Sequence, residues 1–419
     1  MQGSKYKQDA AAYDPLAAAA EKQEIDTLLK RVRLDALTAK ASELRGGIPY
    51  RVPAVQDRKI KRSSVMGGMN YHIDIEFDNG TVWLARIRRF NATSPPPVLR
   101  DHIFRSEVAT LKFLERTTVP TPKVFEYALE GENNPVGVGY MLTEKLPGSS
   151  LRWSRPLTPE RKVIEQLADI FIELQKYPFD KIGSLDSPGS SHLGVFAQES
   201  LTDFDQDSHM PSLGPYTSLQ EYHTASIQFI LDLILRDELY SHRPIDAYLI
   251  HRFLLDLVPS MLPSDESSLF FLKHADDKGD HILVNEEFNI TGIIDWEWAY
   301  TAPAALAFNS PIMLLPVAHF YDGANNIGEQ EEVFAQIFED KGHPSLASIV
   351  RNGRLQHRFA FCCGYDLWND WGGFQGLFQG LREAVNNGAG MNWDQWKAHA
   401  IDRYGSDEGL QFLISRGKT

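Results

Sequence analysis

Hydrophobic and polar positions alternate most regularly in residues 71–90, YHIDIEFDNGTVWLARIRRF. Two runs with an apolar residue at every second position flank the pair Asn79-Gly80. This alternation is typical of strands with one buried face, and Asn-Gly between two such runs is a strong hairpin signal. The pattern therefore predicts two antiparallel strands joined at Asn79-Gly80.

Helical spacing appears on both sides of this hairpin. Residues 16–46 are rich in Ala, Leu, Glu and Lys, have apolar positions at helical spacing and end at a Gly pair, which predicts one or two helices. Residues 102–117 carry a second apolar helical face. Residues 120–127 and 137–151 return to strand character. A small antiparallel sheet that carries one helix is therefore expected.

Beyond Pro147 the pattern is mainly helical, with short strands expected only around residues 271–298. Residues 178–220 are rich in Gly, Pro, Ser and Asp and predict a long irregular insertion. Loops of that length are often lids or binding loops. Whether this one is a lid stays open at this point.

Three parts follow from this order: a helical leader (1–46), a small antiparallel-sheet N-lobe (47–145) and a larger, mainly helical C-lobe (146–419). The predicted fold class is α+β and bilobal. A ligand pocket is expected between unequal lobes.

Composition excludes several classes of protein. With 419 residues, 43% of them hydrophobic and 23% charged, the chain is an ordinary globular protein. It has neither an apolar run of membrane-spanning length nor an apolar signal core, so we expect a cytoplasmic protein. The net charge of −14 argues against nucleic-acid or membrane partners. Cys362 and Cys363 are adjacent, which suits neither a bridge nor a metal site and predicts buried thiols.

Candidate chemistry is concentrated in residues 271–298, FLKHADDKGDHILVNEEFNITGIIDWEW. His274, Asp276 and His281 have the HxDxxxxN spacing of a kinase catalytic loop, except that the last residue is His. Asp295 ends a second apolar strand. Phosphoryl transfer requires one carboxylate that orients and deprotonates the attacking hydroxyl and another that holds magnesium. These roles are assigned to Asp276 and Asp295, respectively.

The same segments resemble the aminoglycoside phosphotransferase family, especially its fungal members, whose usual form is near HGDLxxxNILVD followed by GxIDWE. The resemblance covers most of residues 60–300. It implies a protein-kinase-like fold and transfer of the γ-phosphate of ATP to a hydroxyl of a small molecule. ATP and Mg²⁺ are the implied cofactors, and a hydroxyl-bearing small molecule is the implied partner.

The resemblance also implies roles for residues of the N-lobe. Gly67, Gly68 and Asn70 fall in the loop that covers the nucleotide phosphates, where glycines let backbone amides approach oxygens. Arg86 stands at the position of the phosphate-binding lysine, and it grips phosphate in a different geometry from lysine. Glu107 matches the helix acid that orients this cation.

The segment GYMLTEKLPG resembles the hinge between the lobes of kinase-like enzymes. The backbone near Glu144 and Leu146 is implied to hydrogen-bond the adenine base.

His281 departs from the family pattern, which has asparagine there. An asparagine oxygen suits magnesium, whereas imidazole nitrogen suits transition metals better. Four alternatives stay open: Asp280 supplies the oxygen, one magnesium on Asp295 is enough, manganese replaces magnesium, or no phosphate is transferred. Asp277 and Lys278 replace an apolar and a polar position. Lys278 is predicted to neutralise the neighbouring acids or to reach the γ-phosphate.

Two other functions are weighed against phosphotransfer. One is a pseudokinase that binds a nucleotide or metabolite without catalysis, and the other is nucleotidyl transfer. Tyr216, Tyr222 and His223 are candidates for the acceptor pocket. The tryptophans near the C-terminus predict a core rather than a ligand cage; they are Trp368, Trp371, Trp393 and Trp396. The acceptor and the oligomeric state stay open.

Overall fold

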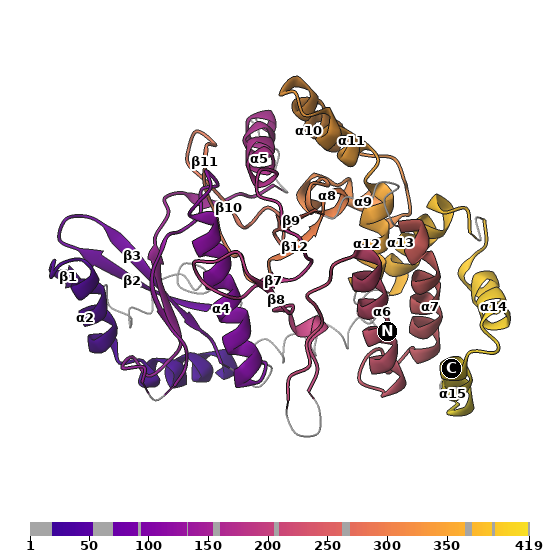
Figure 1. The fold of residues 1–419 in the computed structure, drawn as a ribbon, viewed down its shortest axis with the longest axis horizontal. Coiled ribbons are helices and arrows are strands. Elements are labelled where there is room, and N and C mark those ends of the chain that lie inside the picture. Colours follow the sequence, from indigo (N-terminus) through magenta and orange to yellow (C-terminus); the bar gives the residue numbers. More distant parts are fainter. Residues whose placement is uncertain are drawn as a thin grey trace, which may run out of the picture. The chain divides into compact units, whose positions relative to one another are not determined.

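The computed structural model of the protein describes residues 19–52, 70–90, 94–131, 133–153, 160–204, 209–261, 269–364, 371–387 and 390–417. The chain divides into two compact units, drawn in Figure 1. Unit 1 comprises Met1–Arg116, Thr121–Pro147 and Pro188–Ser190, and unit 2 comprises Thr117–Pro120, Gly148–Ser187 and Ser191–Thr419. None of the helices in the described ranges has the length and apolarity that crossing a bilayer requires.

Unit 1 contains a five-stranded antiparallel sheet in the order β1-β2-β3-β5-β4. Its strands are β1 (Tyr50–Arg51), β2 (Asn70–Phe77), β3 (Val82–Arg88), β4 (Val124–Ala128) and β5 (Tyr140–Glu144). The predicted hairpin is confirmed, because β2 and β3 pair from Asn70↔Arg88 to Glu76↔Val82. Gly80 lies in the turn with φ +83°, a left-handed conformation that glycine adopts without strain.

Helices pack against this sheet within unit 1. Residues 19–31 are helical, and α2 (Leu34–Leu44) follows, so the leader forms two helices. Leu28, Leu37 and Ala41 of the leader are buried together with the apolar face of β2 and β3. The predicted helix at 102–117 is α4 (Pro97–Leu114), and it begins earlier than expected because proline is well tolerated in the first helical turn.

Unit 2 carries three small sheets. β6 (Ser149–Ser150), β10 (Ile282–Val284) and β11 (Ile290–Ile293) lie in the order β11-β10-β6, β9 (Phe270–Lys273) pairs with β12 (Tyr300–Pro303), and β7 (Ser184–Leu185) pairs with β8 (Leu193–Gly194). β6 lies within residues 137–151, where strand character was expected, whereas β7 and β8 correct the expectation that later strands occur only around 271–298. Two-residue strands leave no periodic pattern in a sequence.

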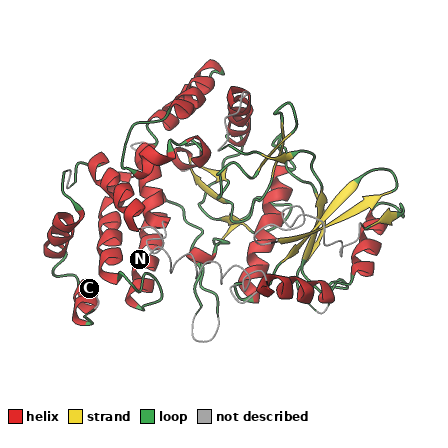
Figure 2. Ribbon diagram, turned by 180° about the vertical axis from the view of Figure 1, so that it is seen from behind, coloured by secondary structure: helices red, strands yellow, loops and turns green. Residues whose placement is uncertain are grey.

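The rest of unit 2 is mainly helical (Figure 2). Its helices are α5 (Glu160–Leu174), α6 (Leu219–Leu235), α7 (Pro244–Met261), α8 (Ala304–Ala307), α9 (Val317–Tyr321), α10 (Glu329–Asp340), α11 (Pro344–Arg351), α12 (Arg354–Gly364), α13 (Trp371–Ala384), α14 (Trp393–Arg403) and α15 (Glu408–Ser415), with 3₁₀ turns η1 (Glu199–Leu201) and η2 (Ile312–Leu314).

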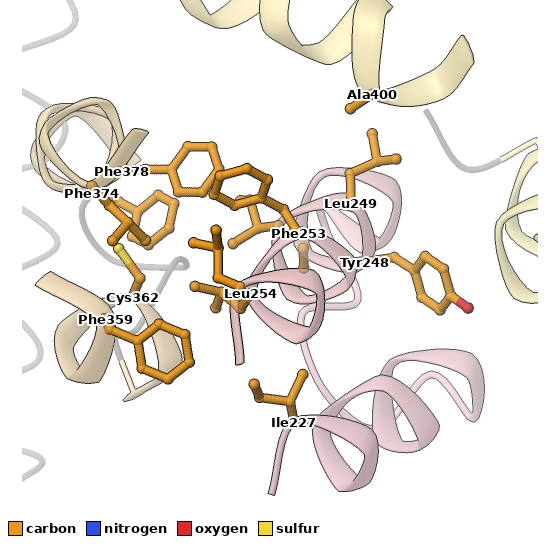
Figure 3. Packing of buried hydrophobic residues seen from close by; sticks show 14 of the residues in the cluster. Ile227, Tyr248, Leu249, Phe253, Leu254, Phe359, Cys362, Phe374, Phe378 and Ala400 are labelled. Carbon is orange, nitrogen blue, oxygen red and sulfur yellow. The ribbon is translucent and has the colours of Figure 1, made fainter. Parts of the chain in front are cut away.

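An aromatic and aliphatic core joins α6, α7, α12, α13 and α14 (Figure 3). Phe253 stands edge-on to Phe378, with ring centroids 5.5 Å apart, and Trp396 is only 2% exposed. Trp371 and Trp393 pack against the same core, whereas Trp368 lies outside the described residues. The expectation that the C-terminal tryptophans form a core is thus confirmed for the three described ones.

The thiols of Cys362 and Cys363 are free, and Cys362 is buried while Cys363 is half-buried. Burial raises the pKa of both thiols, to about 12 for Cys363. Two neutral thiols in the helical core agree with the packing role expected from the sequence.

The insertion at 178–220 is folded wherever the structure describes it. Phe179 bridges to Phe270, Ile182 bridges to Tyr216, and Ile182 and Phe196 lie in a small apolar cluster. Burial of this kind fixes the segment against β9 and α6. The described part of this segment is therefore packed but mostly irregular, as expected, with only β7, β8, η1 and the start of α6 as regular elements.

Candidate active site

The loop between β9 and β10 carries most of the predicted catalytic residues. Gly279 allows the tight path of this loop, since its φ is +105° and an added Cβ would lie 3.1 Å from Met313 Sδ. A side chain at this position would be both strained and crowded.

His274 links this loop to the end of β11. Its Nε2–H donates to the carbonyl oxygen of Ile294 (2.9 Å), and its Nδ1 accepts the backbone N–H of Asp276 (3.1 Å). These partners assign the proton to Nε2. The ring also packs edge-on against Trp296 at 4.8 Å. Burial lowers the pKa of His274, so the neutral ring holds the backbone of Asp276 in place.

Asp276 pairs with the second predicted catalytic residue. Lys278 Nζ lies 3.0 Å from Asp276 Oδ2, with the side chains 57% and 34% exposed, respectively. The hydrogen bond with Asp276 is the main cause that raises the pKa of Lys278. The carboxylate and the ammonium group therefore face solvent together, where a substrate can reach both.

A second ion pair lies beneath the loop, and the sequence reasoning missed it. Lys273 Nζ is 3.2 Å from Asp277 Oδ2, and Asp277 Oδ1 accepts the backbone N–H of Ile312 at 3.1 Å. Burial opposes the charges, but their mutual attraction prevails, raising the pKa of Lys273 and lowering that of Asp277. The available signal was a lysine that ends the apolar strand FFLK four residues before an aspartate.

His281 is 7% exposed and stacks on His274, with ring centroids 4.2 Å apart. Its Nδ1 accepts the backbone N–H of Gly279 at 3.4 Å, which assigns its proton to Nε2. Burial and the neighbouring His274 lower the pKa of His281 to about 3. The ring is thus a neutral, packed part of the loop, and its Nδ1 lone pair is directed at the backbone.

Asp295 follows β11 and is exposed, with φ +64°. A residue with a side chain is uncommon in this left-handed conformation, and such strain is concentrated at functional sites. Asp280 is also exposed. Across the described ranges, no three His, Cys, Asp or Glu side chains come together as a metal site. Magnesium, however, is commonly bound by one or two carboxylates together with substrate phosphates.

Unit 1 brings Arg86 and Glu107 together. Arg86 Nη1 of β3 donates to Glu107 Oε1 of α4, and the two side chains are 13% and 3% exposed, respectively. Asn70, at the start of β2, is buried. The predicted phosphate-loop residues Gly67 and Gly68 lie outside the described residues.

The predicted hinge residues lie at the end of β5. The Glu144 N–H donates to the carbonyl oxygen of Lys123 at 2.9 Å, so this amide is already paired with the neighbouring chain. Leu146 is half-buried beyond the strand end.

A pocket of about 380 Å³ in unit 2 adjoins the catalytic loop at Ala275. Its other lining residues are Gln198, Glu199, Ser200, Tyr222, Trp298 and Tyr300. Gln198 Nε2 of the insertion donates to the Trp298 carbonyl oxygen at 2.9 Å, which fixes one wall. Of the three acceptor-pocket candidates, Tyr222 is among the described lining residues, whereas Tyr216 is not and His223 lines a different pocket.

Relatives among known proteins are fungal and bacterial. A subtelomeric hrmA-associated cluster protein of Aspergillus fumigatus is 35% identical over 125 residues, and clavilactone A biosynthesis cluster protein Y of Ampulloclitocybe clavipes is 25% identical over 272 residues. These matches cover 28% and 62% of this chain, and 23% and 64% of the two relatives. The chain thus spans less than two thirds of the length of either relative.

The solved structure of a candidate fructosamine-3-kinase from Thermobifida fusca YX-ER1 is similar over 83% of this chain and 98% of its own, with a TM-score of 0.51 and 16% identity. This likeness confirms the predicted α+β, kinase-like fold class. The model of the phosphotransferase enzyme family matches residues 73–308, more than half of the chain. The protein therefore belongs to the phosphotransferase enzyme family.

Proposed function

We propose that this protein transfers the γ-phosphate of ATP to a hydroxyl of a small molecule. The observation that carries the proposal is the held Asp276, whose backbone is fixed by His274 and whose carboxylate lies 3.0 Å from Lys278. Phosphoryl transfer depends mainly on positioning the reactants and on neutralising negative charge. In this loop, Asp276 would position the acceptor and Lys278 would neutralise charge.

Asp276 would accept a hydrogen bond from the acceptor hydroxyl and take its proton as the new oxygen–phosphorus bond forms. The bond from the γ-phosphorus to the bridging oxygen of ADP breaks, and ADP leaves with the electron pair. Lys278 would offset negative charge beside Asp276. His274 would act as a positioning residue, because it contacts the Asp276 backbone and not the reacting atoms.

Asp295, together with Asp280 of the loop between β9 and β10, would hold Mg²⁺. Both are exposed carboxylates, and hard oxygen donors fit this ion. When bound, Mg²⁺ neutralises charge on the nucleotide phosphates. His281 fits a metal less well, because its Nδ1 faces the Gly279 amide and its Nε2 carries the proton. Manganese was considered only because His281 would supply a nitrogen ligand. Without that ligand, one magnesium on Asp295 is the simpler proposal.

The proposed contacts of unit 1 to the nucleotide phosphates are Arg86, which Glu107 holds, Asn70 and the Gly67-Gly68 segment. The ion pair of Arg86 on β3 with Glu107 on α4 supports this proposed phosphate contact, because both side chains are nearly buried and hold each other in place. A fixed guanidinium presents two donors to phosphate oxygens. The carbonyl of Glu144 and the amide of Leu146 remain the proposed contacts to adenine.

The pocket beside Ala275 is the proposed acceptor site. Its walls include the aromatic rings of Trp298, Tyr222 and Tyr300, and Glu199 is the one carboxylate among its described lining residues. Aromatic faces with one acid favour an acceptor that has a ring or a cationic group next to its hydroxyl.

The pseudokinase alternative is not adopted, because the chain belongs to a phosphotransferase family and keeps both Asp276 and Asp295. The test is calorimetric titration with ATP, with and without magnesium, on the parent protein, Asp295→Asn and Asp276→Asn. Asp295→Asn should lose magnesium-dependent binding. Asp276→Asn should keep binding but lower ADP release to hydroxyl acceptors by about 10²- to 10⁴-fold.

Asp394→Asn is the matched control, since Asp394 is an exposed aspartate of α14. ATP binding that is unchanged in Asp295→Asn would contradict the metal assignment. Release of AMP or pyrophosphate in place of ADP would instead indicate nucleotidyl transfer.

A further inference from the structure

A second pocket lies in the helical part of unit 2, on the side of α6 that carries His223. It has a volume of about 260 Å³. Its walls come from α6, the end of α7, α8, α11 and α12. The turn from β12 into α8 lines it with the small residues Ala304 and Ala305, which leave room that larger side chains would fill.

The chemistry of the pocket wall is apolar and uncharged. Leu306 and Phe359 are among the apolar lining residues, and none of the described lining residues is an Asp, Glu, Lys or Arg. A charged ligand would find no counter-ion among these described residues, and desolvating its charge would oppose binding. The pocket therefore selects for an uncharged molecule.

Two polar side chains interrupt this apolar wall. They are His223 of α6 and Gln356 of α12. In the described part of the chain, the His223 ring only packs against the rings of Tyr222 (5.1 Å) and Phe359 (4.9 Å), and neither His223 nor Gln356 makes a side-chain hydrogen bond. Burial lowers the pKa of His223 to about 4, so at neutral pH the ring offers one donor and one acceptor.

His223 and Gln356 are half-buried, and a ligand that covers them without a hydrogen bond would leave their polar atoms unsatisfied, so a hydrogen-bonding ligand is favoured. An apolar cavity of about 150 Å³ is enough for benzene, so this larger one fits one or two fused rings. The polar groups add the requirement for a hydroxyl, carbonyl or amide on the ligand.

We propose that this pocket is a binding site for an uncharged ring-containing small molecule whose polar group hydrogen-bonds to His223 and Gln356. It is distinct from the proposed acceptor pocket, which is lined by Tyr222 and not by His223. Binding here does not depend on phosphotransfer, and it is measured without nucleotide.

The test uses 2-naphthol, an uncharged two-ring probe, in calorimetric titrations at pH 7.5, with 2-naphthoate as the charged counterpart. We expect saturable 1:1 binding of 2-naphthol and much weaker binding of 2-naphthoate. The variant Ala360→Trp should abolish the binding of 2-naphthol, because Ala360 is an exposed lining residue and an indole there fills the pocket. His223→Phe should weaken the affinity about threefold to tenfold, as expected for one lost hydrogen bond.

Ala318→Trp, at an exposed alanine of the short helix α9 that does not line the pocket, is the control for adding an indole. Urea unfolding of each variant separates pocket filling from misfolding. Asp276→Asn should bind 2-naphthol like the parent, so a failed phosphotransfer proposal leaves this one standing. Absence of saturable binding, equal binding of naphthoate, or binding that Ala360→Trp leaves unchanged would each overturn the proposal.

Discussion

Asp277 connects three segments of unit 2 through two oxygen atoms. Oδ2 pairs with Lys273 at the end of β9, and Oδ1 accepts the N–H of Ile312 in η2. The side chains of Lys273 and Asp277 are 18% and 13% exposed, respectively. Removing one charge from such a pair leaves the other poorly solvated, whereas replacing both by apolar groups is often tolerated.

We therefore expect Asp277→Leu and Lys273→Met each to lower the free energy of unfolding by about 3 kcal/mol. The double variant Lys273→Met/Asp277→Leu should lose only about 1 kcal/mol, since the Ile312 amide still lacks its acceptor. Urea unfolding followed by tryptophan fluorescence measures all three.

Lys278→Met is the control, because the Lys278–Asp276 pair is exposed and should contribute about 1 kcal/mol or less to stability. If the losses of the two single variants simply add in the double variant, Lys273 and Asp277 are not energetically coupled, and the account of this pair is wrong.

The sequence predicted those site residues that stand at a recognisable local spacing. His274 and Asp276 follow from their spacing, and the resemblance pointed to Arg86 and Glu107, which the structure pairs. The stacking of His281 on His274, the ion pair of Lys273 and the aromatic wall at Trp298 could not be predicted in this way. The spacing of Lys273 and Asp277 offered a local signal, but the folded path of the loop decides which of its side chains meet, and the wall at Trp298 also depends on contacts with the distant insertion.

At the scale of elements, α12 is bound to the segment after α9 by one buried arginine. Arg358 is fully buried and donates to the carbonyl oxygens of Phe320 and Ala324 at 2.6 Å and to Asn325 Oδ1 at 3.1 Å. Its guanidinium also lies 4.2 Å from the centroid of the Phe320 ring. Burial lowers the pKa of Arg358 to about 10, which leaves it charged at neutral pH.

Arg358→Lys should destabilise the protein by about 3 kcal/mol although the charge is kept, because an ammonium group cannot reach three acceptors in a planar fork. Arg358→Met should cost at least as much. Thermal and urea unfolding measure both changes. Arg416→Lys, at an exposed arginine that caps α15, should change stability by about 0.5 kcal/mol or less. Full stability in Arg358→Lys would show that charge alone matters.

Long periodic elements were predictable, and short ones were not. The β2–β3 hairpin and α4 carry repeated apolar positions over 7 or more residues, so local pattern and tertiary burial agree. β7 and β8 have 2 residues each and owe their pairing to the burial of the insertion around Phe196. Their existence depends on tertiary packing that no local pattern encodes.

At the scale of the whole molecule, three buried histidines and the half-buried His223 connect stability to pH. They share a pKa lowered mainly by burial, to about 4 for His223, His251 and His357 and to about 3 for His281. In the unfolded chain each imidazole would titrate near pH 6.5. Between these values the unfolded state binds more protons, so stability is full above about pH 6.5 and falls as the pH drops toward the folded-state pKa.

Lowering the pH from 7.5 to 5 should therefore remove about 2 kcal/mol of stability per buried histidine, a large share of the 5 to 15 kcal/mol typical of proteins. The measurement is the free energy of urea unfolding at pH 7.5, 6 and 5.

The lowered pKa of Asp277 affects stability only below this pH window, because a carboxylate titrates near pH 4 when the chain is unfolded. His223→Phe should remove the contribution of one proton from this pH dependence of the unfolding free energy. A stability that stays constant down to pH 5 would mean that these rings are protonated in the folded protein, and it would remove the basis for treating His281 and His223 as neutral.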